Sequence, residues 1–211
     1  MNFWASILMT LLISQSVGAS IVLWGVEIDG LEIGSGLALL SNSVVDSAPD
    51  PVVNTLSLSV PFRFQEIFVF RPEAQVHFQN YGFENGRAVP LESMFDSVMM
   101  MALVLSPRVG VEFSLGDNLG VMGDWSLDFV NRIPVFFIGQ GGSQALDITG
   151  WFISGRFLYT SVSGGMLWKF SEFFTLALRG KYSLPLFNFW TGETWWDQQI
   201  WELGLGIRWV F

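Results

Sequence analysis

The chain ends in WELGLGIRWVF, residues 201 to 211, and this stretch decides the fold. Leu203, Leu205, Ile207, Trp209 and Phe211 alternate there with small or charged residues. Because side chains two positions apart on a β-strand share a face, the segment has one apolar and one polar face. Chain ends usually fray and gain little from large apolar groups. The pattern therefore predicts a strand that is held in a sheet to its last residue.

The same alternation recurs along the chain. It occupies residues 31–40, 54–64, 70–78, 108–115, 119–129, 162–170, 174–184 and 201–211. Short links of hairpin type fall at 65–66, 116–118 and 171–172. Long links fall at about 41–53, 80–97, 131–150 and 188–198. The sequence therefore predicts an all-β protein of eight antiparallel strands, joined alternately by long and short links, which can close into an up-and-down barrel without free edges.

The polar face has the composition of a confined interior. It carries seven of the ten basic residues and six acidic residues, so its charge nearly cancels. Matched charge favours a lumen, since an unpaired buried charge is costly. Glycines at alternate positions of this face would leave room for long side chains. The predicted lumen charge network consists of Glu32, Arg63, Arg71, Glu73, His77, Arg108, Glu112, Asp124, Asp128, Lys169, Arg179, Lys181, Glu202 and Arg208.

The apolar face suits a membrane. The chain is 51% hydrophobic and 16% aromatic but only 14% charged, against a usual charged share of about 25%. Its longest internal apolar run, residues 98–105, is too short for a transmembrane helix. Aromatic side chains on this face cluster beside the short turns, where a membrane barrel meets lipid headgroups. A transmembrane barrel is therefore favoured over a soluble barrel with its apolar face inward. The sequence contains no cysteine, which excludes disulfides.

The N-terminus predicts an export signal. Residues 3–13 are mostly apolar, and Val17-Gly18-Ala19 is a small-residue cleavage site. No lysine or arginine precedes the apolar stretch, so a buried strand or helix start is the alternative. We expect residues 1–19 to be a signal peptide and 20–211 to be the barrel. Residues 20–30 alternate out of phase with the first strand, as either a bulged extension of it or a separate lead.

The terminal strand gives the chain a family resemblance. It resembles the eight-stranded outer-membrane β-barrels of Gram-negative-type envelopes, a class that includes the OmpA transmembrane domain, OmpX and OmpW. In that class the last strand ends in an aromatic residue, has apolar residues at alternate positions and is read by the barrel-assembly machinery. The matching residues here are Leu203, Leu205, Ile207, Trp209 and Phe211. The resemblance implies an outer-membrane location in a diderm bacterium and outer-membrane lipid as a partner.

Function is expected to lie in the four long links, because side chains fill the lumen of an eight-stranded barrel. The links are acidic or neutral, which disfavours nucleic acid and leaves a surface ligand unknown. His77 has no adjacent serine, and neither cofactor nor metal spacings occur. We expect a non-enzymatic protein with a structural or surface-interaction role. The alternatives are OmpW-like permeation of small or hydrophobic compounds and, more weakly, a lipid-modifying enzyme.

Overall fold

The structure is a computed structural model that describes residues 21–23, 26–42, 50–92, 97–137 and 141–210. The expected signal peptide, residues 1–19, and Phe211 lie outside the described residues. The elements are β1 (Ile21–Leu23), β2 (Val26–Ile28), β3 (Leu31–Leu40), β4 (Val52–Ser59), β5 (Phe62–Phe64), β6 (Phe68–Glu84), β7 (Arg87–Leu91), β8 (Val98–Ser114), β9 (Leu119–Phe137), α2 (Gly141–Ile153), β10 (Leu158–Lys169), β11 (Phe174–Pro185), α3 (Asn188–Thr191) and β12 (Ile200–Trp209).

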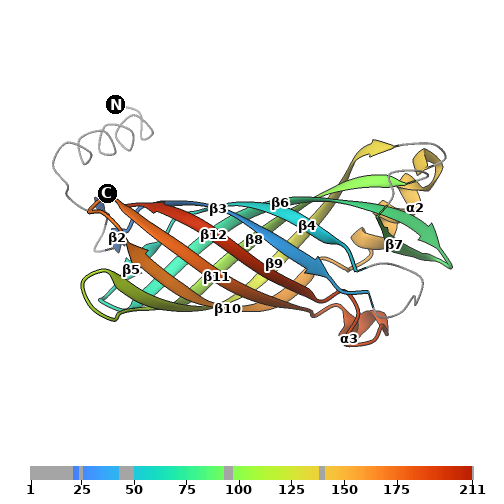
Figure 1. The fold of residues 1–211 in the computed structure, drawn as a ribbon. Coiled ribbons are helices and arrows are strands. Elements are labelled where there is room, and N and C mark those ends of the chain that lie inside the picture. Colours follow the sequence, from blue (N-terminus) through green and yellow to red (C-terminus); the bar gives the residue numbers. More distant parts are fainter. Residues whose placement is uncertain (1–20, 24–25, 43–49, 93–96, 138–140, 211) are drawn as a thin grey trace, which may run out of the picture.

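The strands close into an antiparallel barrel, as predicted (Figure 1). Around the wall the order is β3, β12, β11, β10, β9, β8, β6 and β4, and β4 pairs with β3 to complete the ring. The short strand β5 continues the line of β4, because both pair with β6 on either side of a break at Val60 and Pro61. The closing strand β12 pairs with β11 on one side and with β3 on the other.

The long connections contain more regular structure than the alternation predicts. Strand β6 runs on to Glu84 and pairs with β7 through the two-residue turn Asn85-Gly86, in which both residues have positive φ. An Asn-Gly pair suits such a turn because both residues tolerate the left-handed region. Strand β9 likewise extends to Phe137, and helix α2 follows it. Strand pairing therefore continues beyond the segments whose alternation marks them as barrel wall.

The start of the described chain forms a hairpin of its own. Strand β1 pairs with β2, and β2 pairs with β5. The chain then turns at Gly30, which has a φ of 126°. A Cβ at Gly30 would lie 2.0 Å from the carbonyl oxygen of Trp209, so the closing strand leaves space only for glycine. The β1–β2 hairpin is thus a separate lead and not an extension of β3.

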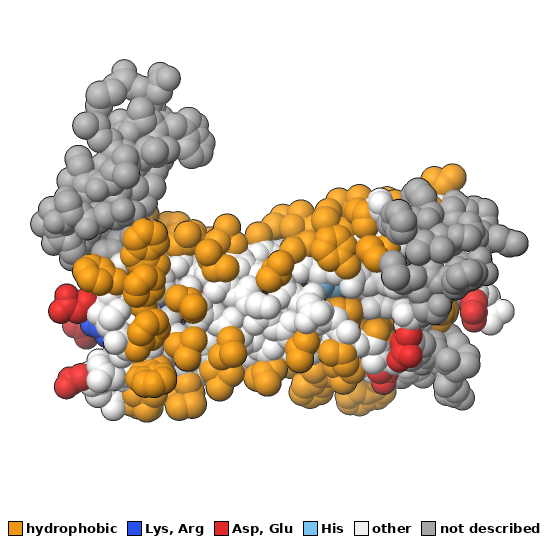
Figure 2. Space-filling model, turned by 45° about the horizontal axis from the view of Figure 1, so that its top comes forward, with side chains coloured by type: hydrophobic (Ala, Val, Ile, Leu, Met, Phe, Trp, Pro, Cys, Tyr) orange, Lys and Arg blue, Asp and Glu red, His pale blue; other side chains and the backbone are white. Residues whose placement is uncertain are grey.

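The outer wall is apolar over most of its length. Leu203, Leu205 and Ile207 of β12 are 62%, 56% and 52% exposed, while Arg208 between the outward positions is buried. Figure 2 shows hydrophobic side chains over this wall, gathered toward both ends of the barrel, one of which bears the short turns. Aromatic rings stack in that region, with centroids 6.0 Å apart for Phe170 and Phe174. Neither helix in the described part of the chain is long and apolar enough to cross a membrane.

Candidate functional site

The ionic network of the lumen is densest near the short-turn end, and Glu112 lies at its centre. The Glu112 carboxylate pairs with Arg63 at 2.8 Å, with Arg208 at 2.7 Å and, more closely still, with Arg71. Arg71 is fully buried and also donates to Asp124 at 2.6 Å. Each guanidinium of this group therefore faces at least one carboxylate, which offsets the cost of removing its charge from water.

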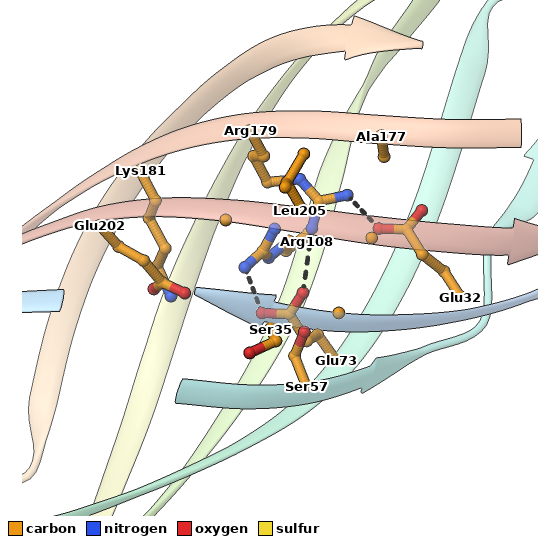
Figure 3. A pocket seen from close by; sticks show the side chains of 13 residues that line it. Glu32, Ser35, Ser57, Glu73, Arg108, Ala177, Arg179, Lys181, Glu202 and Leu205 are labelled. Atoms are coloured by element: carbon orange, nitrogen blue, oxygen red, sulfur yellow. Dashed lines mark hydrogen bonds and ion pairs between the residues drawn. The ribbon is translucent and has the colours of Figure 1, made fainter. Parts of the chain in front are cut away.

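A second group of ion pairs crosses the middle of the lumen (Figure 3). Glu73 accepts hydrogen bonds from Arg108 and, at 3.2 Å, from Arg179. Arg179 also donates to Glu32 at 2.7 Å, and Glu32 links this group to Arg208 at 3.2 Å. Arg179 of β11 and Glu73 of β6 lie on opposite sides of the ring, so their pair crosses the lumen. Glu32 with Arg208 and Glu73 with Arg108 instead join neighbouring strands. The cavity between them measures about 20 Å³, little more than one water molecule needs.

A third, smaller group lies farther along the lumen. Lys181 pairs with Asp128 at 2.8 Å, and the hydroxyls of Ser126 and Ser161 donate to the same carboxylate at 2.6 and 2.8 Å. Glu202 accepts hydrogen bonds from Thr55 at 2.9 Å and from Gln75 at 2.6 Å. The Asp128 carboxylate is thus held by one charged and two neutral donors, whereas both of these donors to Glu202 are neutral.

Two predicted members do not join the network. Lys169, the last residue of β10, is exposed beside the open cavity at the short-turn end and has no ion pair among the described residues. Its position in the alternating pattern is that of a lumen-facing residue. Because β10 ends at Lys169, its side chain lies at the opening of the barrel at the short-turn end. His77 is buried, yet neither ring nitrogen has a hydrogen-bond partner in the described part of the chain.

One lumen glycine shows why small residues lie opposite long ones. A Cβ at Gly206 would lie 3.1 Å from Oε1 of Glu32 and 3.3 Å from its Cγ. These separations are tighter than ordinary van der Waals contacts, so a side chain there would push Glu32 away from its arginine partners. The glycine thus leaves the space that the carboxylate occupies.

The alternation did not reveal an apolar layer inside the lumen. At the long-link end, inward-facing residues from several strands pack together instead of pairing charges. The layer consists of Ala38, Leu40, Val53, Ala102, Val104, Val130, Tyr159, Phe187 and Ile200. Tyr159 and Phe187 meet edge to face with ring centroids 5.3 Å apart. The lumen is therefore filled at two levels, by ion pairs at one level and by packed apolar side chains at the other. The signal was present in the sequence, since these residues of β3, β8, β9 and β12 continue the inward phase of the charged positions.

The outer loops are packed against one another. Helix α2 rests on β6, β7 and β8 through a small core of Tyr81, Ala88, Val98, Met100, Ala145, Ile148, Trp151 and Phe152. Arg132 is buried below this core, donates to the Tyr159 hydroxyl at 3.0 Å and lies 4.3 Å from the Phe152 ring centre. Arg87 pairs with Asp197 at 2.7 Å. Sequence reasoning assigned Tyr81, Arg87, Ala88, Arg132, Ala145, Ile148 and Asp197 to solvated links and so missed the assembly.

Asp29 was also missed. It lies just after β2 and pairs with Arg63 at 2.5 Å and with Arg208 at 3.1 Å. The β1–β2 hairpin is thereby tied to the lumen network. No periodic pattern points to Asp29, because it lies in the turn before β3.

Comparison with known proteins decides the class of fold. No protein-family model matches the sequence, and no curated protein matches it. Among solved structures, Neisserial surface protein A (NspA) is 11% identical and superposes with a TM-score of 0.59, over 89% of this chain and 99% of NspA. The protein has the fold of the small eight-stranded outer-membrane β-barrels.

Two further outer-membrane barrels resemble this one. Ail, the attachment invasion locus protein of Yersinia pestis, was solved with the heparin analogue sucrose octasulfate; it is 11% identical with a TM-score of 0.51, over 87% of this chain and 97% of Ail. The outer-membrane enzyme PagL is 12% identical with a TM-score of 0.44, over 85% of this chain and 99% of PagL. The last score is too low to support an inference about activity.

The terminal strand of this barrel points its apolar residues away from the lumen. Leu203, Leu205, Ile207 and Trp209 are all exposed on the outer wall, and Phe211 lies outside the described residues. The Trp209 ring stacks on Phe174 of β11 with centroids 6.4 Å apart. The strand thus presents an uninterrupted apolar row at the barrel surface.

Proposed function

We propose that the chain is an outer-membrane barrel with a closed lumen, whose function is structural or lies in surface interactions of its long outer loops, without enzymatic activity. The double closure of the lumen supports this proposal most strongly. Ion pairs among Glu32, Glu73, Arg108 and Arg179 fill one level, and the apolar layer around Tyr159 fills another. A water-filled path for solutes would have to displace both levels. The long loops, in contrast to the filled lumen, form an ordered surface that is packed around α2.

Reconstitution into planar lipid bilayers tests the closed lumen. We expect no stepwise ionic conductance from the wild-type protein, because the spaces beside Glu73 and His77 measure only about 20 and 10 Å³. We also expect Arg179→Met to remain non-conducting, since the apolar layer lies at a different level. Steady conductance by the folded wild-type protein would refute a closed lumen.

One observation favours the permeation alternative. The outer wall has an apolar hollow of about 540 Å³, beside Gly164, Gly180, Tyr182 and Trp201. An apolar solute could enter such a hollow from the bilayer. Uptake of a fluorescent apolar dye into proteoliposomes would test this, with Gly180→Leu as the variant that fills the hollow. The closed-barrel proposal expects no protein-dependent uptake in either protein; uptake that Gly180→Leu abolishes would favour permeation.

We also propose that the apolar row of β12 acts as an assembly signal for the barrel-assembly machinery. The side chains of Leu203, Leu205, Ile207 and Trp209 are exposed to the surroundings of the barrel and do not stabilise its interior. Deleting Phe211 should therefore lower the amount of protein inserted in the outer membrane more than it lowers the stability of the inserted barrel. Normal membrane levels of the truncated protein in cells would contradict this role.

A further inference from the structure

An exposed apolar surface lies on the two loops that flank β10 and β12. We call it the loop aromatic surface, and it consists of Ile153, Phe157, Phe189, Trp190, Trp195 and Trp196. Ile153, Phe189 and Trp196 are 71%, 65% and 69% exposed. Isolated exposed apolar residues are common, but a group of this kind marks a binding surface for protein or lipid.

The surface is held in place by contacts between the loops. Arg156, next to Phe157, pairs with Glu193 at 2.9 Å, and its guanidinium lies 4.3 Å from the Trp151 ring centre. A Cβ at Gly155 would lie 2.9 Å from Nε1 of Trp190, so the two loops touch directly at that point. The loops therefore present their aromatic side chains together.

The second loop is also braced within itself. Asn188 donates to the carbonyls of Thr194 and Asp197, at 2.8 and 3.2 Å. The rings of Phe189 and Trp195 meet edge to face, with centroids 4.0 Å apart. These interactions fix the conformation of the loop, so Trp196 is exposed at a defined position.

The surface continues the lipid-facing wall of the barrel. Strand β11 ends at Pro185 and β12 begins at Ile200, so Phe189 and Trp196 lie only four residues from the strand ends. Directly along the wall, the outward rings of Tyr182 and Trp201 lie 4.2 Å apart. Aromatic residues thus run from the wall onto the loops, which is the level where a membrane barrel meets the headgroup region.

Charge also favours lipid over a polar ligand. Glu193 and Asp197 are the only charged residues in 186–200. Both side chains are largely buried and each is paired with an arginine. The exposed part of the loop is therefore neutral, so it offers nothing to attract a charged glycan and nothing to oppose burial in hydrocarbon.

We propose that the loop aromatic surface binds lipid of the outer leaflet in which the barrel is embedded, at the boundary between acyl chains and headgroups. This inference rests on the proposed outer-membrane placement. Tryptophan and phenylalanine suit that boundary because they combine a large apolar area with, in tryptophan, a hydrogen-bond donor. The loops on this side of the barrel then lie on the membrane, and the β6–β7 hairpin is left as an outward-pointing element for other partners.

Spin labelling provides the test, because the sequence contains no cysteine. Single nitroxides are placed by Phe189→Cys and Trp196→Cys in phosphatidylcholine nanodiscs that hold one barrel each. Leu205→Cys on the outer wall serves as the lipid control, and Glu84→Cys beside the hairpin turn serves as the water control; both positions are exposed. Power saturation then compares the access of oxygen and of a water-soluble nickel chelate to each label.

The labels at 189 and 196 should show several-fold less access to the nickel chelate than the label at 84, and a depth between those at 84 and 205. Nickel access equal to that at 84 would overturn the inference. Spin–spin broadening in discs that hold two barrels, relieved by dilution with unlabelled protein, would assign the surface to a second copy and overturn it as well. If the label at 205 is itself in water, the membrane placement fails; if 205 is in lipid and 196 is not, only the lipid surface fails.

Discussion

At the scale of single residues, the stability of the lumen depends on buried arginines that are surrounded by carboxylates. Arg71 is the clearest example, since its side chain is fully buried between Glu112 and Asp124. Removing one partner of such a pair leaves the remaining charge buried without compensation, which costs more than the pair itself contributes. Lys169 offers a contrast, because it has the same charge but lies exposed at the mouth.

Arg71→Met should lower the free energy of unfolding by about 3 to 5 kcal/mol, because it leaves the buried Asp124 carboxylate without its arginine and removes one of the three arginines around Glu112. The matched control Lys169→Met should change it by no more than about 0.5 kcal/mol. Urea titration of both variants in lipid vesicles measures the difference. Equal stabilities for the two variants would mean that the ion pairs contribute nothing.

His77 should behave in the opposite way. Its ring nitrogens are buried without hydrogen-bond partners among the described residues, and an unsatisfied buried polar group costs about 1 to 3 kcal/mol. His77→Leu, which keeps the bulk and removes the polar atoms, should therefore raise the free energy of unfolding in the same urea titration. A loss of stability would instead indicate a bound water in the cavity of about 10 Å³ that His77 lines.

At the scale of the element, the two faces of a strand impose different limits on adjacent residues. Gly164 and Gly165 are neighbours in β10, and they pair with Gly180 and Arg179 of β11. A Cβ at Gly165 would lie 2.1 Å from the carbonyl oxygen of Leu178, whereas a Cβ at Gly164 would meet nothing closer than 3.7 Å. Of these two neighbours, only Gly165, on the lumen side, is sterically required to be glycine.

Gly165→Ala should therefore push β10 and β11 apart and destabilise the barrel by about 1 to 3 kcal/mol. Gly164→Ala should be neutral or stabilise it by up to about 1 kcal/mol, through the lower entropy of the unfolded chain. The fraction of compact protein on unheated SDS gels, together with urea titration, distinguishes the two. A larger loss from Gly164→Ala would mean that the register of β10 is inverted.

At the scale of the whole molecule, closure of the sheet leaves an apolar outside and a paired inside. Every strand of the ring has two neighbours, so the barrel has no free edge within its wall. The outer wall cannot be solvated by water without exposing rows such as Leu203, Leu205 and Ile207. The fold and the apolar surface together favour a protein that is stable only in lipid or detergent.

The intact protein should require detergent for extraction and should migrate differently on SDS gels before and after heating. The closed hydrogen-bonded ring resists unfolding by the detergent until it is heated, and a fully heated sample is the control. A protein that remains soluble and monomeric in buffer without detergent would contradict the membrane assignment.

The sequence by itself determined the eight strands of the wall, the two faces of each and an arrangement that can close into a barrel. These follow from the alternation in segments such as 54–64 and 201–211, because side-chain direction on a strand is a local property with a period of two. The same periodicity placed Arg71, Glu112 and Arg208 on the inner face before any contact between them was known. It could not place Lys169, since alternation does not show where the lumen ends.

Only the tertiary structure decided which residues meet across the lumen and what closes it. Arg179 meets Glu73, 106 positions away, and Thr55 meets Glu202, 147 positions away. The tilt and stagger of the closed strands set such pairings. The apolar layer around Tyr159 and the packing of α2 on the loops arise in the same way, from side chains that closure brings together. The period of the sequence thus fixes the face of each residue, and closure of the barrel fixes its partners.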